Sequence, residues 1–370
     1  MSERYIGLMS GTSMDGIDAA LVEFNNQHIK LIGHHSHPIS NDLRQKLLTL
    51  ALNDTTASID MLGEVNAELG NVFADATLEV LKKYSCPVSS IKAIGSHGQT
   101  IRHQPDVEHP FSMQIADANR IAYRTGITTV ADFRGKDIAA GGQGAPLAPA
   151  FHKAVFSSNT EDRGILNIGG IANLTFLPSN SQQASFGFDT GPGNMLMDSW
   201  IKRHQNKNFD ADGNWAKSAQ HDSQLLQKLL TDEYLGKEPP KSTGREHYNL
   251  QWLDTQLDEF SKLDPAIVQA TLAQFTAQTI QQAVTKYMPS IRTLIICGGG
   301  NHNTHLITLL QNLLTDIRIC SSDDYGIEPD WVEAIAFAWL AKQTLEHKTV
   351  SLTEITGARE NVILGAIYPV

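Results

Sequence analysis

The sequence predicts an α/β protein built from two related halves, and three observations lead to this fold class. Short apolar runs alternate with longer amphipathic stretches along the chain, as strands alternate with helices around an α/β sheet. The segment Tyr5–Phe24 reads as two buried strands around a turn, GTSMDG. The segment Gly164–Leu177 (GILNIGGIANLTFL) repeats this design of strand, glycine turn and strand. Because the chain has 370 residues, two domains fit its length.

Composition narrows the class of protein. The hydrophobic share of 41% is that of a globular protein, and no apolar run reaches the roughly 18 residues that a membrane span needs. The apolar run after Met1 is too short for a signal peptide. The three cysteines, Cys86, Cys297 and Cys320, lack the paired spacings that hold zinc. A formal net charge of −11 opposes binding to nucleic acid or anionic membranes. We therefore expect a cytoplasmic protein that binds small molecules.

The turn in Gly11–Asp18 has the composition of a phosphate-binding loop. Its two glycines let main-chain N–H groups approach an anion, and the Thr-Ser pair between them adds hydroxyl donors. Asp15 and Asp18 would repel a phosphate unless a cation such as Mg²⁺ lay between them. The alternative is an ordinary hairpin turn, in which Asp and Gly are also common.

Hydrophobic periodicity and glycine or proline breaks define the other expected elements. In the first half we expect strands at His28–Ser40, Ile91–Gly95 and Gly126–Arg134, and helices at Asn41–Leu52, Ser58–Tyr84 and Gln114–Thr125. In the second half we expect a strand at Phe186–Asn194, a buried strand at Ile291–Cys297, and helices at Met195–His204, Ser223–Leu230, Pro265–Tyr287, from about Asn303 and from about Pro329.

Polar residues follow the predicted strand at Ile91–Gly95, where ligands bind in an open α/β sheet. His97 in this SHGQT cluster either contacts a sugar or phosphate oxygen or is a hydrogen-bonded turn histidine. Asp132 and Arg134 stand at the end of the next strand, and they either pair with each other or grip a substrate. An acidic substrate would explain Arg134, because a guanidinium matches a carboxylate in a two-pronged geometry.

The stretch Ala139–Pro149 (AAGGQGAPLAP) is the most flexible by composition, and it predicts a hinge or a lid loop. The change of domain is expected near it. No complete dinucleotide fingerprint and no G-x-x-x-x-G-K-[ST] motif occurs in the chain.

Asp189 lies at the end of the strand in FGFDTGPGN, between glycines and with no adjacent cation in sequence. Such a carboxylate is placed to accept a proton, or else it forms an Asx turn or caps the following helix. Further on, the polar loop KSTGREHYN offers Lys241, Ser242, Thr243 and Arg245 to a phosphate or to solvent.

Gly298–Gly300 leave no side chains where a flat base or a ribose could lie, and Asn301 and Asn303 either bond the base edges or cap the next helix. Glu333 lies near the first turn of the last long helix, where a capping-box role is the alternative to a ligand contact.

These pieces, in this order, resemble the bacterial anhydro-N-acetylmuramic acid kinase family of the sugar-kinase, actin and heat-shock ATPase superfamily. The segments that carry the resemblance are IGLMSGTSMDGIDAAL, IGSHGQTIRH, TVADFR, NIGGIANLT, FDTGPGN, CGGGNHN and WVEAIAFAWLA. The resemblance implies a two-domain, actin-like ATPase (ribonuclease H-like) fold, in which each domain is a mixed β-sheet flanked by helices and the active-site cleft lies between them. We expect domain boundaries that give residues 1–135 plus 345–370 to one domain and 136–344 to the other.

The family's activity implies an ATP-dependent kinase that opens the 1,6-anhydro ring of 1,6-anhydro-N-acetylmuramic acid with water and phosphorylates O6, in peptidoglycan recycling. It implies ATP and Mg²⁺ as cofactors, a homodimer, and Asp189 as the general base. Residues implied to bind the nucleotide are Gly11, Thr12, Ser13, Met14, Asp15, Gly16, Ile17, Asp18, Gly169, Gly170, Asn173, Gly298, Gly299, Gly300 and Asn301, with Asp15 near the metal, directly or through water. Residues implied to contact the sugar are His97, Gln99, Asp132, Arg134 and Glu333.

Two rival functions remain at this point. A plain amino-sugar kinase would need a base near a free hydroxyl rather than near the anomeric carbon. A non-catalytic ATP-binding protein of the same fold would lack the base, and Asp189 argues against it.

Overall fold

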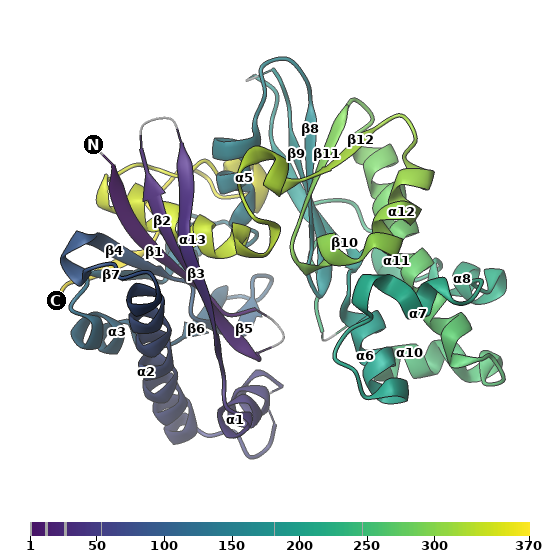
Figure 1. Ribbon diagram of the computed structural model, residues 1–370, viewed down its shortest axis with the longest axis horizontal. Coiled ribbons are helices and arrows are strands. Elements are labelled where there is room, and N and C mark those ends of the chain that lie inside the picture. The colour runs from purple at the N-terminus through teal and green to yellow at the C-terminus, as the bar shows by residue number, and fades with distance from the viewer. Residues whose placement is uncertain (1, 12–13, 26–27, 53, 181, 246) are drawn as a thin grey trace. The chain divides into compact units, whose positions relative to one another are not determined.

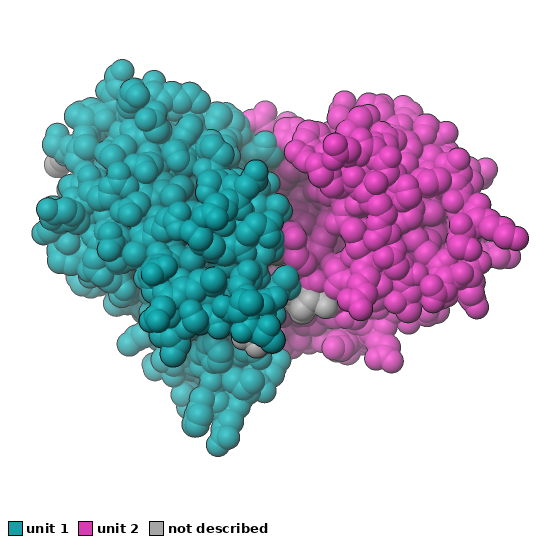
Figure 2. All heavy atoms as spheres, turned by 90° about the horizontal axis from the view of Figure 1, so that it is seen from below, with its two compact units in different colours: residues 1–151, 326–370 teal, residues 152–325 magenta. Residues whose placement is uncertain are grey.

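The computed structural model describes residues 2–11, 14–25, 28–52, 54–180, 182–245 and 247–370. Thr12 and Ser13, both predicted to bind the nucleotide, lie outside the described residues. The chain forms two compact units, unit 1 (Met1–Phe151 and Gly326–Val370) and unit 2 (His152–Tyr325), which Figure 2 colours separately. This division differs from the expected boundaries after residues 135 and 344, because residues 136–151 and 326–344 also belong to unit 1.

Unit 1 is built on a mixed sheet of six strands. Their order is β13 (Ala366–Tyr368), β7 (Thr129–Ala131), β4 (Ile91–Ser96), β1 (Glu3–Met9), β2 (Gly16–Phe24) and β3 (Ile29–Pro38). β1, β2 and β3 are antiparallel neighbours, β4 runs parallel to β1, and β7 runs parallel to β4. A separate hairpin pairs β5 (Gln99–Gln104) with β6 (Phe111–Ile115).

Helices cover both faces of the unit 1 sheet. On one face, α2 (Ile59–Lys83) packs in a common core with Ile6 and Leu8 of β1. Gly7 lies between those two residues and therefore faces the other side of the sheet. There an added Cβ would overlap the carbonyl oxygen of Ala334 in α13 (Val332–Leu345), and Gly95 of β4 stands against the same helix. The two glycines thus allow the α13 backbone to approach the sheet closely.

The remaining helices of the first part of the chain are shorter. They are α1 (Asn41–Ala51), α3 (Ala118–Thr125), α4 (Phe133–Ala139) and α5 (Ala148–Phe156), with α14 (Thr353–Thr356) near the carboxyl end.

Unit 2 contains a mixed sheet of five strands. Their order is β10 (Phe186–Pro192), β9 (Ile171–Leu177), β8 (Arg163–Ile168), β11 (Thr293–Cys297) and β12 (Arg318–Ser321). Figure 1 shows the unit's helices beside this sheet, and they share its hydrophobic core. These helices are α6 (Met195–Gln205), α7 (Asn214–Lys217), α8 (Ser223–Leu229), α9 (Glu233–Gly236), α10 (Leu250–Leu257), α11 (Pro265–Tyr287) and α12 (Thr304–Leu313).

The two sheets share one strand order. β3-β2-β1-β4-β7 in unit 1 corresponds to β10-β9-β8-β11-β12 in unit 2, and in both sheets the first three strands are antiparallel and the last two run parallel to the central strand. This repeated arrangement confirms the predicted α/β fold class of the ribonuclease H-like, actin-like type, with one mixed sheet in each unit.

Two expected elements of unit 1 are wrong in part. The helix predicted at Gln114–Thr125 begins only at Ala118, because the residues before it form β6 and pair with β5. The strand predicted at Gly126–Arg134 is shorter in the structure, where it is limited to β7, because Asp132 caps a helix that starts at Phe133. Among the residues that the structure describes, no helix is long and apolar enough to cross a membrane.

Candidate active site

The predicted first phosphate loop is the turn between β1 and β2 in unit 1. The N–H of Met14 donates to the carbonyl of Gly11 at 3.2 Å, and Met14 adopts a left-handed backbone conformation, with φ of 54°. The side chains of Met14 and Ile17 are buried in the core of unit 1. These two residues can therefore contact a ligand only through their main chain.

Carboxylates gather beside this turn. Burial raises the pKa of Asp18, the neighbouring carboxylates of Asp15 and Asp330 raise it further, and a hydrogen bond of 2.8 Å from Ser36 Oγ opposes the rise. A cation at this end of the turn would remove the repulsion among the carboxylates. Among the described residues, however, no three His, Cys, Asp or Glu side chains come together closely enough to hold a metal ion, so the predicted metal contact of Asp15 stays a prediction.

Gln99 ties two parts of unit 1 together. Its Oε1 lies 2.8 Å from Ser10 Oγ, at the end of β1, and its Nε2 donates to the carbonyl of Thr100 at 3.3 Å. Gln99 is buried, with 2% of its surface exposed. These contacts explain its position without a ligand, so the predicted sugar contact of Gln99 stays a prediction.

His97 and Arg134 form a close pair in unit 1. A guanidinium has only donors, so His97 Nε2 accepts from Arg134 Nη2 at 2.9 Å and from Nε at 3.3 Å. The proton of the imidazole is therefore on Nδ1, which donates to the carbonyl of Gly98 at 2.9 Å. Burial, and then the charge of Arg134, hold the pKa of His97 well below its usual value. His97 is thus a neutral acceptor that orients the guanidinium.

Two carboxylates face the Arg134 charge. Burial lowers the pKa of Arg134 to about 10, and the charges of Glu333 and Asp137 act in the opposite direction. Asp132 has another role, because it caps α4 by accepting from the N–H of Gly135 at 3.2 Å. Of the predicted sugar contacts, the structure brings together His97 and Arg134, and the charge of Glu333 acts on Arg134.

The predicted hinge or lid stretch is fastened within unit 1 near Gly144. The Gly144 carbonyl accepts from Arg134 Nη1 at 2.8 Å, and its N–H donates to Asp137 Oδ2 at 2.7 Å. Asp137 Oδ1 accepts from Thr356 Oγ1 at 2.8 Å, and the N–H of Gln143 donates to the Thr356 carbonyl at 2.8 Å. This stretch is therefore connected directly to the guanidinium of Arg134.

In unit 2, the predicted second phosphate loop is the turn between β8 and β9. The carbonyl of Gly170 accepts from the N–H groups of Gly193 and Met195, at 2.9 and 3.1 Å, and the carbonyl of Gly169 accepts from Asn194 at 2.9 Å. The turn is thus bonded to the first residues of α6. These contacts hold the turn and the start of the helix as one piece.

A row of polar side chains crosses the unit 2 sheet. Asp189 on β10 pairs with Asn173 on β9, and Asn173 pairs with Asn167 on β8. Directly opposed residues in antiparallel strands place their side chains on the same face of the sheet. Asp189, Asn173 and Asn167 therefore lie side by side on one face.

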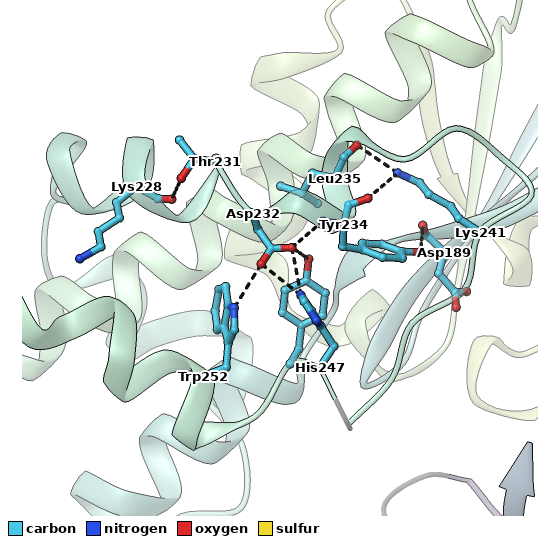
Figure 3. A network of polar contacts seen from close by, with 10 residues as sticks. Asp189, Lys228, Thr231, Asp232, Tyr234, Leu235, Lys241, His247 and Trp252 are labelled. Carbon is cyan, nitrogen blue, oxygen red and sulfur yellow. Dashed lines mark hydrogen bonds and ion pairs between the residues drawn. The ribbon is translucent and has the colours of Figure 1, made fainter. Parts of the chain in front are cut away.

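Asp189 itself lies at an irregularity of β10. The register with β9 shifts between Asp189 and Gly191, and such bulges re-aim side chains. Thr243 N–H donates to Asp189 Oδ2 at 3.0 Å, the phenol of Tyr234 donates to the Asp189 carbonyl at 2.8 Å, and Asp189 N–H donates to the Lys241 carbonyl at 3.2 Å. Figure 3 shows Tyr234 and Lys241 on either side of Asp189.

The glycine run follows β11. Gly298 has a φ of 79°, and an added Cβ would overlap Asn167 Oδ1, so both backbone conformation and space require glycine there. Asn303 caps α12 by accepting from Leu306 N–H at 3.0 Å, which is the second of its two predicted roles. Asn301 lines a depression of about 370 Å³ beside α12 and β12.

A second pocket, of about 350 Å³, opens beside Gly299. Burial, and then the neighbouring Asp210 carboxylate, raise the pKa of Asp198 in its wall to about 7. Asp210 accepts from the N–H groups of Trp215 and Ala216, both at 2.9 Å. The residues that line the pocket are Asn194, Met197, Asp198, Phe209, Asp210, Asp212, Gly299, His302 and Asn303.

Sequence reasoning did not identify Tyr234, Asn167 or the pocket residue Asp198 as parts of the site. For Tyr234 no sequence signal exists, because it reaches Asp189 across 45 residues of chain. Asn167 carried a signal, since it stands at the end of an apolar strand directly before the glycine turn.

The family model for anhydro-N-acetylmuramic acid kinase matches residues 3–370 of this chain. The chain is 50% identical to the anhydro-N-acetylmuramic acid kinase of Coxiella burnetii (strain RSA 493 / Nine Mile phase I), over 99% of this chain and 97% of that protein. It is 48% identical to the enzyme of the same name from Vibrio cholerae serotype O1, over 100% of this chain and 99% of that protein.

Solved structures of other proteins resemble the fold at low sequence identity. Component A of (R)-2-hydroxyglutaryl-CoA dehydratase from Acidaminococcus fermentans aligns with a TM-score of 0.49 at 10% identity, over 91% of this chain and 96% of that chain. A ROK family glucokinase from Streptomyces griseus aligns with a TM-score of 0.42 at 12% identity, over 92% of this chain and 99% of that chain.

Proposed function

The chain belongs to the anhydro-N-acetylmuramic acid kinase family, and we propose that Asp189 is the general base of its reaction. Membership of this family makes the chain an ATP-dependent kinase that opens the anhydro ring of 1,6-anhydro-N-acetylmuramic acid and phosphorylates O6. The acceptor is an alcohol oxygen, and the product is N-acetylmuramic acid 6-phosphate. The reaction belongs to peptidoglycan recycling and amino-sugar catabolism.

The orientation of Asp189 is the observation that carries this proposal. Its carboxylate stands at a bulge, in a polar row with Asn173, and the Thr243 N–H holds one of its oxygens. A carboxylate fixed in this way can take a proton from a water molecule that attacks the anomeric carbon. As the bond between that carbon and O6 breaks, its electron pair stays on O6, which attacks the γ-phosphorus. The bond from that phosphorus to the β-phosphate bridging oxygen then breaks, and ADP leaves.

For the nucleotide, we propose that the Gly11–Asp18 turn, the turn at Gly169 and Gly170, and Asn173 bind the phosphates. Gly298–Gly300 and Asn301 lie near the adenosine, and the pocket beside Gly299 supports this placement by its size of about 350 Å³. Main-chain N–H groups and small residues allow the close approach that phosphates require.

We propose Mg²⁺ as the metal, with Asp15 contacting it directly or through water. The resemblance to the family carries this part of the proposal, and a cation would relieve the repulsion that the Asp15 and Asp330 charges exert on Asp18. When bound, the ion neutralises phosphate charge.

For the sugar, we propose that Arg134 binds the lactyl carboxylate, since a guanidinium pairs with a carboxylate through two parallel hydrogen bonds. Neutral His97 orients the guanidinium, which supports a sugar-binding role for both residues, and the charge of Glu333, which acts to raise the pKa of Arg134, supports including Glu333. Gln99 and Asp132 are proposed as further contacts.

Two further parts of the proposal concern the protein in its cell. We propose that it acts in the cytoplasm, where ATP is available and where the thiols of Cys86, Cys297 and Cys320 stay reduced. We also propose a homodimer, on the resemblance to the family alone.

The test of Asp189 is product analysis in ¹⁸O-labelled water. The protein is incubated briefly with ATP, Mg²⁺ and 1,6-anhydro-N-acetylmuramic acid, and the product is analysed by mass spectrometry. We expect a 6-phosphorylated sugar with one label at the anomeric hydroxyl, and a loss of turnover of roughly 10²- to 10⁴-fold in Asp189→Asn. The short reaction time limits label that enters by anomeric exchange.

Other outcomes would each contradict a part of the proposal. Wild-type turnover in Asp189→Asn would remove Asp189 as the base. Phosphorylation of a free amino sugar in preference to the anhydro sugar would favour the plain amino-sugar kinase.

A further inference from the structure

The outer edge of β10 is closed at Asp189 by a loop instead of a strand. β10 is the edge strand of the unit 2 sheet, so its outward main-chain groups have no neighbouring strand to pair with. At Asp189 the main-chain N–H donates to the Lys241 carbonyl, and the main-chain carbonyl accepts from the Tyr234 phenol. The Asp189 carboxylate accepts from the Thr243 N–H. All three contacts come from one stretch of chain.

Asp232 fastens both ends of that stretch. Its carboxylate accepts from Tyr234 N–H at 3.1 Å, from His247 Nε2 at 3.0 and 3.1 Å, from the Tyr248 hydroxyl at 3.0 Å and from Trp252 Nε1 at 3.2 Å. We call these five residues the Asp232 network, and Figure 3 shows Asp232 between Tyr234, His247 and Trp252. The Asp232 side chain is only 9% exposed, so its contacts are shielded from water.

The network closes a loop in the chain. His247, Tyr248 and Trp252 follow Asp232 by 15, 16 and 20 residues, and one carboxylate binds all three. Between these ends lie Lys241 and Thr243, which touch Asp189. Fixing the two ends of a loop removes most of the freedom of the residues between them.

Lys241 adds a cross-link inside the loop. Its ammonium donates to the carbonyls of Tyr234 and Leu235, at 3.4 and 3.1 Å, and lies 4.9 Å from the centre of the Tyr234 ring. The two residues that contact the Asp189 main chain are therefore bonded to each other as well as to Asp189. A shift of one moves the other.

We propose that Asp232 is a positioning residue of the reaction, which acts through Tyr234 and the Lys241–Thr243 segment to hold the Asp189 carboxylate in its productive orientation. The proposal rests on the proposed role of Asp189 as general base. In this role Asp232 acts through its neighbours and makes no contact with the substrate or the reacting atoms. A misplacement of about 1 Å at a catalytic group can cost roughly 10²-fold in rate, so loss of this support is expected to lower turnover.

Two variants test the proposal from different sides. Asp232→Asn keeps the size of the side chain but replaces one acceptor oxygen by an NH₂ group that cannot accept from the donors around it. Tyr234→Phe keeps the ring and deletes only the hydroxyl that reaches Asp189, so it remains informative if Asp232→Asn fails to fold. The matched control is Asp222→Asn, because Asp222 also caps a helix of unit 2, α8, where its carboxylate accepts from the Gln224 and Leu225 N–H groups of that helix.

The measurements are kcat and KM for the sugar and for ATP, with the urea midpoint of each variant. We expect kcat to fall roughly 10- to 100-fold in Asp232→Asn and roughly 10-fold in Tyr234→Phe, with both KM values within about twofold of the wild type. Asp222→Asn is expected to keep its kcat. In an Asp189→Asn background, Tyr234→Phe is expected to cause no further loss, because the group that it positions is already gone.

The outcomes separate this inference from the proposed function. Inactive Asp189→Asn together with wild-type kcat in folded Tyr234→Phe would overturn the positioning role alone. The positioning role would also be overturned if Tyr234→Phe lowered kcat by the same factor in the Asp189→Asn background as in the wild type, since the effect would then not pass through Asp189. Wild-type turnover in Asp189→Asn would overturn both.

Discussion

Two neutral hydrogen-bond acceptors hold the guanidinium of Arg134 in unit 1 in place, while the charges of Glu333 and Asp137 act to raise its pKa. His97 accepts from Nε and Nη2, and the Gly144 carbonyl accepts from Nη1. Neither partner carries a negative charge, because His97 is neutral and the carbonyl is only a dipole. Such a guanidinium is rigid and yet able to bind an anion, which suits a carboxylate on a substrate.

This arrangement gives a prediction for Arg134→Gln. We expect KM for 1,6-anhydro-N-acetylmuramic acid to rise roughly 10- to 100-fold, because this factor corresponds to the binding free energy of one or two lost charge-assisted hydrogen bonds. The KM for ATP is expected to stay unchanged. The control is the analogous anhydro-N-acetylglucosamine, which lacks the lactyl carboxylate. If Arg134→Gln weakened both sugars equally, the contact with the carboxylate would be refuted.

Asp198 in unit 2 gives a prediction on pH. Its pKa in the folded protein is about 7 against an ordinary value of 3.8, chiefly because of burial. The folded state therefore keeps a proton that the unfolded state releases, and the free energy of unfolding falls as pH rises from about 4 to about 7. Asp198→Asn removes this dependence, and we expect it to be more stable than the wild type above pH 7 by about 1–3 kcal/mol.

The check is a series of urea unfolding curves between pH 5 and pH 8. The exposed Asp258 lies in the same unit, and Asp258→Asn is expected to keep the wild-type slope. A slope in Asp198→Asn equal to that of the wild type would exclude Asp198 as its source.

Among the elements of unit 1, α13 depends on two single positions in the strands beneath it, Gly7 and Gly95. A Cβ at Gly7 would overlap the Ala334 carbonyl oxygen, and one at Gly95 would overlap the carbonyl oxygen of Phe337. Backbone atoms cannot rotate away as a side chain can. The helix must shift as a whole to admit a methyl group at either position.

For Gly7→Ala we therefore expect a loss of about 1–3 kcal/mol or more in the free energy of unfolding, as in other overpacked cores. Gly63→Ala is the matched control, because Gly63 lies in α2 and, outside the helix's own backbone, no described atom lies within 4 Å of its added Cβ. There the change is expected to stabilise the protein by about 1 kcal/mol through helix propensity. Chemical denaturation measures both, and unchanged stability in Gly7→Ala would disprove the close packing of α13.

The elements that the sequence predicted well are those with a strong local pattern. α11 has the predicted bounds, Pro265–Tyr287, because proline at its start, a preceding Asp264 cap and a long apolar period all act locally. β6 was missed because its strand character comes from pairing with β5, which periodicity in one segment does not show.

The same distinction applies to the candidate site. The glycine turns and Asp189 carry their signal in consecutive residues, so the sequence could single them out, and their roles in the site stay predictions. The support of Asp189 comes from residues 45 and 54 positions away, Tyr234 and Thr243, and depends on how the loop folds back on β10. Main-chain donors such as the Thr243 N–H leave no trace in the identity of the residue.

At the scale of the whole molecule, two sheets with one strand order carry different insertions. The central strands, β1 and β8, each lead into a glycine turn and an antiparallel neighbour. Unit 1 adds β13 at its edge and the β5–β6 hairpin, whereas unit 2 adds the helices and loop that surround β10. The repeated halves are thus alike in their frameworks and different in the segments that surround the proposed chemical groups.

Unit 1 is assembled from two separate stretches of chain, and this has a consequence for the order of events at the ribosome. All of unit 2 is synthesised before Gly326–Val370, so its core can close while unit 1 still lacks α13. During that interval the face of β1 and β4 around Gly7 and Gly95 is uncovered. The newly made chain therefore carries an exposed sheet face until Gly326–Val370 emerges, and transiently exposed surface of this kind favours aggregation.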